Sequence, residues 1–290
     1  MFSQPIRDSS RSPVQGDDGA RLASKDIVLT VTSGRSGTKL LAVLLRDVFG
    51  LHAEHEPAPR ANLALRPAIA DPAYAREWLI SEKLPEIAKS GARTYIETSH
   101  VYCKGFIEAF FACGLEPRFI ILRRDPRAVA ESLFKMNGIP ERTEAGKLVL
   151  LGPSDPHVLP LPDWERYSDY QLCYWYAREI ERRQAFYVGQ FRSGSLSYFD
   201  ISIDELIDVH SLLRLAMFID PSASLNETSR ERFKEIVSRN QNPRNVALEG
   251  AVDRLLPSDT ARQEHEVDIA CAPYWIPSAR ALALGRHARP

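Results

Sequence analysis

Residues 26–49, DIVLTVTSGRSGTKLLAVLLRDVF, decide the fold. The run 26–32 is apolar and β-branched, which is typical of a buried strand in a parallel sheet. Residues 38–49 are rich in leucine and valine, and Gly50 follows them where the C-cap glycine of a helix belongs. The connection between the two runs is short, so the stretch predicts a strand, a tight loop and a helix.

The same alternation continues along the chain. Further strands are predicted at 51–56, 94–98 and 118–123, and near 195–199. Helices are predicted at 72–90 with an interruption at Pro85, at 104–113, 127–136 and 164–191, and near 202–219 and 229–239. Strands that alternate with helices imply βαβ units, so we expect an α/β fold with a mostly parallel central sheet flanked by helices.

All of these elements are expected in one domain, residues 25–277. Residues 137–162 hold too many glycines and prolines for one regular element, so we expect an irregular insertion there, near the site. Residues 1–24 mix polar residues with Gly and Pro and lack the apolar run of a signal peptide or membrane anchor, so we expect a disordered tail. Residues 278–290 are expected to form a C-terminal tail.

Composition narrows the classes of function. The chain has 290 residues, 44% hydrophobic and 26% charged, which suits a globular protein with a sizeable core. Its 37 Lys and Arg against 38 Asp and Glu give a net charge of -1, which argues against nucleic acid and membrane surfaces as partners. The four cysteines form no C-x-x-C pair, which favours free thiols in a reducing compartment, and the cytoplasm is our expectation.

The loop that precedes the first helix has the features of an anion site. Backbone N–H groups and the positive end of the helix dipole converge there. Gly34 and Gly37 allow the backbone to approach an anion closely. Ser36 and Thr38 add hydroxyl donors, and Arg35 adds a charged fork. The loop therefore predicts phosphate binding.

A nucleotide triphosphatase loop has a lysine directly after its second glycine. Here Thr38 holds that position and Lys39 comes one residue later, which disfavours hydrolysis of ATP or GTP. A phosphate-loop kinase and a nucleotide-binding module without catalysis stay open as alternatives.

A second group of cations surrounds the carboxyl end of the strand at 118–123. Open parallel sheets bind ligands at this end of their strands, so the group is expected to face the site. It consists of Arg118, Arg123, Arg124 and Arg127. Asp125 is a helix N-cap candidate, and Ser132 lies about 10 Å farther along that helix, where its hydroxyl is expected to meet Arg124 and hold a second phosphate.

Together these segments resemble the sulfotransferases that use 3′-phosphoadenosine 5′-phosphosulfate (PAPS). Arg35-Ser36-Gly37-Thr38 matches the family's K/R-S-G-T loop for the 5′-phosphosulfate. Residues 124–132 (RDPRAVAES) match its motif for the 3′-phosphate, R-x-P-R/K-x-V-x-x-S. Residues 196–219 are loosely similar to the family's later strand and helices.

The resemblance implies a P-loop-like sulfotransferase architecture, PAPS as sulfuryl donor, 3′,5′-ADP as product and no metal. Arg35 with the amides of residues 36–38 would bind the 5′-phosphosulfate, and Gly34 and Lys39 flank this loop. Arg124 and Ser132 would hold the 3′-phosphate. Many members also clamp that phosphate with a basic-glycine segment near the C-terminus, but R-K-G is missing around Arg244.

Transfer to a hydroxyl or amine requires a base for the acceptor proton. Glu56 is the first candidate, because carbohydrate and tyrosyl-protein members of the family use a glutamate soon after the first helix. His55 is the second, and His100, after the strand at 94–98, is the third. The period of a strand would place His52, Glu54 and Glu56 on one face, which leaves a metal site there as an alternative.

The acceptor is expected to be a small molecule, a carbohydrate or a lipid, with peptide tyrosine also open. Its choice would depend on the variable segments 57–71 and 137–162. The aromatic residues of the helix at 164–191 are interpreted as core. Oligomeric state leaves no signal in the sequence.

Overall fold

The computed structural model describes residues 17–239 and 254–275, which fall into two compact units. Residues 17–124 and 196–239 form the sheet unit, and residues 125–195 and 254–275 form the helical unit. A single domain over 25–277 stays a prediction. The long aromatic helix buries its side chains within the helical unit, which therefore has a core of its own.

The sheet unit contains five parallel strands in the order β2-β3-β1-β4-β5. Their bounds are β1 Asp26–Val31, β2 Ala53–His55, β3 Thr94–Thr98, β4 Arg118–Arg123 and β5 Tyr198–Ser202. The predicted α/β class with a mostly parallel sheet flanked by helices is therefore confirmed. β1 lies in the middle of the sheet, and the carboxyl ends of all five strands reach the same edge.

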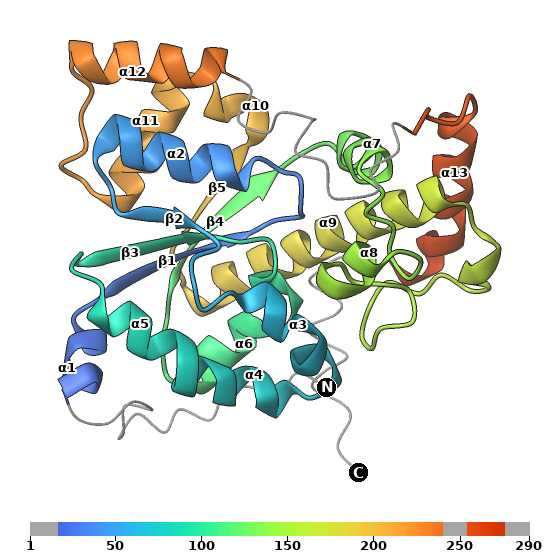
Figure 1. The fold of residues 1–290 in the computed structure, drawn as a ribbon, viewed down its shortest axis with the longest axis horizontal. Helices are drawn as coiled ribbons and strands as arrows, with labels where there is room; N and C mark the ends of the chain where they lie inside the picture. The colour runs from blue at the N-terminus through green and yellow to red at the C-terminus, as the bar shows by residue number, and fades with distance from the viewer. Residues whose placement is uncertain (1–16, 240–253, 276–290) are drawn as a thin grey trace. The chain divides into compact units, whose positions relative to one another are not determined.

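Helices cover both faces of this sheet (Figure 1). One face carries α2 (Thr38–Phe49), α11 (Val209–Ile219) and α12 (Glu227–Ser238). The other carries α3 (Ala61–Ala70), α4 (Pro72–Trp78), α5 (Leu84–Lys89) and α6 (Phe106–Ala112). The remaining elements are α1 (Asp17–Ala23), η1 (Leu79–Lys83), η2 (Tyr102–Lys104) and α10 (Ile203–Leu206).

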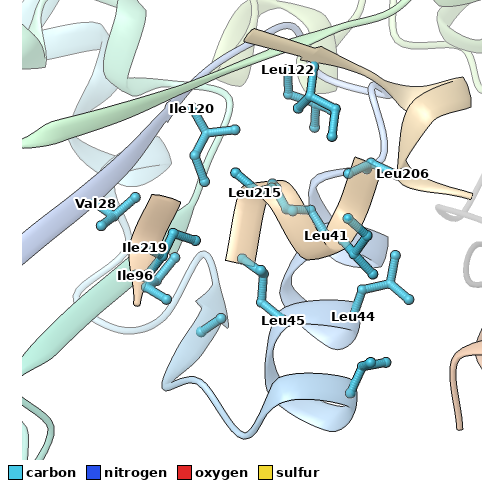
Figure 2. Packing of buried hydrophobic residues seen from close by; sticks show 14 of the residues in the cluster. Val28, Leu41, Leu44, Leu45, Ile96, Ile120, Leu122, Leu206, Leu215 and Ile219 are labelled. Carbon is cyan, nitrogen blue, oxygen red and sulfur yellow. The ribbon is translucent and has the colours of Figure 1, made fainter. Parts of the chain in front are cut away.

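A continuous apolar cluster joins the sheet to α2 and α11 (Figure 2). Alternate residues of β4, Ile120 and Leu122, point into it, as the period of a strand requires. From the helix side, Leu41, Leu44 and Leu45 of α2 meet them at helical spacing. This packing fixes the start of α2 against the end of β1, and so it fixes the loop between them.

The helical unit is built around α9, a helix of 26 residues. Its members are α7 (Pro126–Lys135), α8 (Glu144–Val149), η3 (Trp164–Arg166), α9 (Asp169–Gly194), α13 (Thr260–Cys271) and η4 (Ala272–Tyr274). Tyr170, Trp175 and Tyr176 of α9 are fully buried, so the interpretation of these aromatic residues as core is confirmed. α8 lies inside the predicted insertion 137–162, which otherwise lacks regular helices and strands in the structure.

Two predicted boundaries were wrong. The long helix begins at Asp169 rather than at 164, because Ser168 and Gln171 form a reciprocal capping box. β5 spans Tyr198–Ser202 rather than 195–199, because Ser195 has a left-handed backbone and ends α9. In both places a local cap overrides the apolar pattern.

Besides α8, three helices lie where the sequence predicted none. α1 occupies residues of the expected N-terminal tail, α3 occupies the variable segment 57–71, and α13 precedes the expected C-terminal tail. Residues 1–16 and 276–290 lie outside the described residues. None of the helices that the structure describes has both the length and the apolar character needed to cross a membrane.

Candidate active site

The parallel sheet brings four chain segments to one edge. β1 runs into the loop 32–37, β2 into Glu56, β3 into His100 and β4 into Arg124. The chain places β2 and β3 on one side of β1 and β4 on the other, so the strand order reverses here. Ligands of open α/β sheets bind outside the carboxyl ends of the strands at such a reversal.

The loop between β1 and α2 contains two left-handed residues. The φ angle is 68° at Arg35 and 87° at Gly37. A Cβ atom at Gly37 would lie 2.8 Å from Cδ1 of Ile203, which is closer than real Cβ atoms approach a neighbour. Glycine is therefore favoured at position 37, by the left-handed backbone conformation and by the close approach of the Ile203 side chain.

The hydroxyl of Ser36 supports this loop from inside. Ser36 is fully buried, and its Oγ lies 2.5 Å from the Oγ of Ser33. Thr38 is also buried at the start of α2, whereas Lys39 is exposed on the first turn. Among the described residues, no side chain caps the N-terminus of α2. The backbone N–H groups of its first turn and the positive end of its dipole therefore face the loop.

Arg124 holds the loop from the neighbouring strand end. Its Nη1 donates a hydrogen bond to the carbonyl oxygen of Arg35. Burial lowers the pKa of Arg35, and the positive charge of Arg124 lowers it further. Two cations that disfavour each other's charge are stabilised by an anion between them. Arg35 and Arg124 therefore form the cationic centre of the candidate site.

The other three arginines of the predicted group have partners of their own. Arg118 begins β4 and donates to two carbonyls at the end of α11, so it lies at the opposite end of the strand. Arg123 forms an ion pair with Asp200 of β5, with 2.6 Å between Nε and Oδ1. Arg127 pairs with Glu264 inside the helical unit. The expectation is wrong for Arg118, because it lies at the start of the strand and not at its carboxyl end. For Arg123 and Arg127, which are ion-paired, it stays a prediction.

The two residues of the predicted second phosphate site belong to different units. Arg124 is the last residue of the first segment of the sheet unit, and Ser132 lies half-buried on α7 of the helical unit. Arg244 lies outside the described residues. A shared grip of Arg124 and Ser132 on one phosphate stays a prediction.

Two of the candidate bases are neighbours beside the loop. His100 Nε2 lies 3.5 Å from Glu56 Oε1, and both side chains are largely buried. Gly34 faces the His100 ring, since a Cβ atom there would lie 3.6 Å from Nδ1. Lys104 Nζ lies 2.9 Å from the same nitrogen. His100 thus lies beside the carboxylate of Glu56 and faces the anion loop at Gly34.

Electrostatics keep His100 neutral. Burial lowers its pKa well below the ordinary value, and the charges of Lys104, His55 and Arg35 lower it further. An imidazole that is neutral at physiological pH has one donor and one acceptor nitrogen. The contact with Glu56 is therefore between a carboxylate and a neutral ring.

His55 is bound to the neighbouring strand. Its Nδ1 lies 2.8 Å from the carbonyl oxygen of Thr98, and because a carbonyl only accepts, Nδ1 donates. Glu56 has a φ of 48°, so it leaves the alternation of β2 and does not share a strand face with His52 and Glu54. Among the residues that the structure describes, no group of three or more His, Cys, Asp or Glu side chains is arranged to hold a metal ion.

Comparisons with known proteins give a likeness among solved structures and none in sequence. No protein-family model matches the chain, and no curated protein matches it. Among solved structures, the chain is similar to the "Sulfotransferase Domain from the Curacin Biosynthetic Pathway", with 14% identity and a TM-score of 0.42 over 84% of this chain and 98% of that one. The function proposed below rests on the residues and their geometry.

Sequence reasoning missed Lys104, which contacts the imidazole of a predicted base. The residue stood at the start of the helix predicted at 104–113, four positions after His100. Side chains at that spacing meet on a helical turn, so the spacing was a usable signal. The contact was not predicted because the predicted helix began only at residue 104, whereas the helical turn η2 begins at Tyr102.

Proposed function

We propose that this protein is a sulfotransferase that moves a sulfuryl group from PAPS to a hydroxyl or amine of an acceptor. One observation carries the proposal: the guanidinium of Arg124 is bound to the carbonyl of Arg35, so the two motif segments meet at adjacent strand ends. The residues fit a 5′-phosphosulfate, because left-handed turns, a helix N-terminus and two guanidinium groups converge on the loop.

In this proposal Arg35 and the amides of residues 36–38 hold the phosphosulfate and stabilise charge on the transferred and leaving oxygens. The donor supplies the sulfuryl group: the acceptor atom forms a bond to sulfur as the bond from sulfur to the 5′-phosphate oxygen breaks. Arg124 and Ser132 bind the 3′-phosphate, and 3′,5′-ADP is the product.

Glu56 is the proposed base. Its carboxylate lies beside His100, whose ring faces the loop, and takes the acceptor proton as the new bond forms. His100 is a weak proton acceptor because its pKa is lowered by burial and by neighbouring cations. His55 donates Nδ1–H to the backbone of β3 and is the second choice.

Two measurements test the proposal. Calorimetric titration should show binding of 3′,5′-ADP and much weaker binding of ATP with magnesium, which is the ligand of the kinase alternative. Incubation with labelled PAPS and a metabolite extract should yield a labelled sulfate ester or sulfamate, identified by mass. Preference for ATP with magnesium would overturn the assignment.

Three variants localise the site. Arg124→Met should weaken 3′,5′-ADP binding by about 10- to 100-fold, the range for losing a hydrogen bond to a charged group. Glu56→Gln should abolish turnover and leave that affinity nearly unchanged. Arg46→Met is the matched control, because Arg46 is an exposed arginine near the far end of α2 that pairs with Asp47. Equal affinities for Arg124→Met and the control would remove Arg124 from the site.

A further inference from the structure

Lys104 is a buried cation in contact with an imidazole. Its residue is only 2% exposed, and its Nζ lies 2.9 Å from Nδ1 of His100. An ammonium group has three donors and no acceptor, so in this contact Nδ1 is the acceptor. A neutral ring whose Nδ1 accepts must carry its proton on Nε2.

The proton on Nε2 faces the carboxylate of Glu56. Nε2 lies 3.5 Å from Glu56 Oε1, a long separation of the kind that tightens when substrate binds. The ammonium of Lys104 thus donates to the ring of His100, and the ring donates toward the carboxylate of Glu56. In the opposite tautomer, Nδ1–H would point at the ammonium, and a bare Nε2 would face a carboxylate with no proton between them.

We propose that Lys104 is a positioning residue that fixes the Nε2–H tautomer of His100, so that His100 orients the Glu56 carboxylate instead of taking the acceptor proton. The part of this inference that concerns the acceptor proton rests on the proposed sulfotransferase function. The tautomer itself does not.

The other groups around the ring support this assignment. The charged and titratable neighbours of His100 are Lys104 from η2, His55 from β2, Arg35 from the anion loop and Glu56 after β2. Three of them are basic, and together with burial they disfavour a second proton on the ring. Gly34 faces the ring, since a Cβ atom there would lie 3.6 Å from Nδ1, so the loop and Lys104 both adjoin this side of the imidazole.

Nuclear magnetic resonance of 15N-histidine-labelled protein measures the tautomer directly. The signals of His100 are assigned by their loss in His100→Gln. In the parent protein, Nε2 should be protonated and Nδ1 bare, without titration over roughly pH 5 to 8, the range in which histidine ordinarily titrates. A parent ring with the proton on Nδ1, or one that titrates normally in this range, overturns the proposal without the need for any variant.

Variants test whether Lys104 is the cause. Lys104→Met should shift the population toward Nδ1–H or bring the ring into titration, and Lys104→Arg should restore the parent pattern because it again places only donors at Nδ1. Lys89→Met is the control, since Lys89 is exposed and pairs with Glu86. A folded Lys104→Met protein that keeps the parent pattern overturns the proposal.

The link to catalysis has a separate readout. In the PAPS assay, Lys104→Met should lower kcat by about tenfold or more, because a ring in the wrong tautomer cannot donate to the carboxylate. Its affinity for 3′,5′-ADP should stay within about twofold of the parent, which is under 0.5 kcal/mol. Absence of transfer in the parent, with the tautomer as expected, would reject the proposed function and keep the role of Lys104. An unchanged kcat in a variant with an altered tautomer would reject the role of His100 in orienting Glu56.

Discussion

Replacing Gly37 by alanine tests the geometry of the anion loop. Two effects are expected to lower the free energy of unfolding. The φ angle of 87° is left-handed, and an L-residue there is strained by about 1–2 kcal/mol. The added Cβ would also lie 2.8 Å from Cδ1 and 3.2 Å from Cγ1 of Ile203, so the Ile203 side chain, α10 or the loop must shift.

The magnitude follows from these two terms. Alanine lowers the entropy of the unfolded chain, which offsets about 0.4–1 kcal/mol of the backbone strain and leaves about 1 kcal/mol. Overpacking of a close contact adds about 1–3 kcal/mol. Gly37→Ala should therefore lower the free energy of unfolding by about 2–4 kcal/mol in urea titrations followed by circular dichroism.

Gly50→Ala is a control at the other end of the same helix. Gly50 also has a left-handed backbone, with a φ of 67°, but a Cβ there meets nothing within 4 Å. Gly50→Ala should lower the free energy of unfolding by the backbone strain alone, about 1 kcal/mol. The difference between the two variants isolates the contact with Ile203.

A double variant separates strain from contact. Ile203→Ala removes both atoms that the new Cβ would touch, so Gly37→Ala should cost less in that background and approach the cost of Gly50→Ala. Gly37→Ala should also weaken 3′,5′-ADP binding by about tenfold, or 1.4 kcal/mol, while Gly50→Ala should not. Equal costs for both glycines, with no relief from Ile203→Ala, would refute the close approach of α10 to the loop.

Two further predictions concern charged groups outside the proposed chemistry. Lys83 and Glu97 form a fully buried ion pair, with 2.7 Å between Nζ and Oε2. Lys83→Met should lower the free energy of unfolding by about 3–5 kcal/mol, and adding Glu97→Gln should recover part of that loss in urea titrations; an additive loss would contradict the pairing. Burial alone would raise the pKa of Asp169, but hydrogen bonds from Arg254 and Arg142 hold it below its ordinary value. A lowered native pKa gives stability that is present at neutral pH and is lost in acid, so the parent should lose stability more steeply than Asp169→Asn as the pH falls below about 4. Parallel pH profiles of unfolding would count against this role.

Contiguous apolar patterns were sufficient to predict most of the sheet unit. The predicted strands 94–98 and 118–123 and the helix 38–49 have the bounds of β3, β4 and α2. Each combines a clear period with a strong end signal, such as Gly50 after α2. Local preference and tertiary packing agree at these elements.

Helix α13 was missed because half of its buried face is polar. Gln263 and Glu264 are buried in it, and their partners are residues of α9 and its cap and Arg127 of α7. A hydrophobic period is absent where buried positions are satisfied by hydrogen bonds rather than by apolar contacts. α3 was missed for another reason: Pro67 lies inside it, and the prolines before it read as a loop.

The candidate site was predictable only where it is continuous in sequence. The loop 33–38 is one segment, so its glycines, hydroxyls and arginine indicate an anion site by themselves. The arginines near β4 look alike in sequence, yet Asp200 and Glu264 neutralise two of them from 77 and 137 residues away. Arg124 remains at the loop because β4 pairs with β1, which places its side chain against the carbonyl of Arg35. A sequence motif therefore identifies Arg124 as a candidate ligand-binding residue. Which of the arginines beside it are neutralised depends on acidic partners that are distant in sequence.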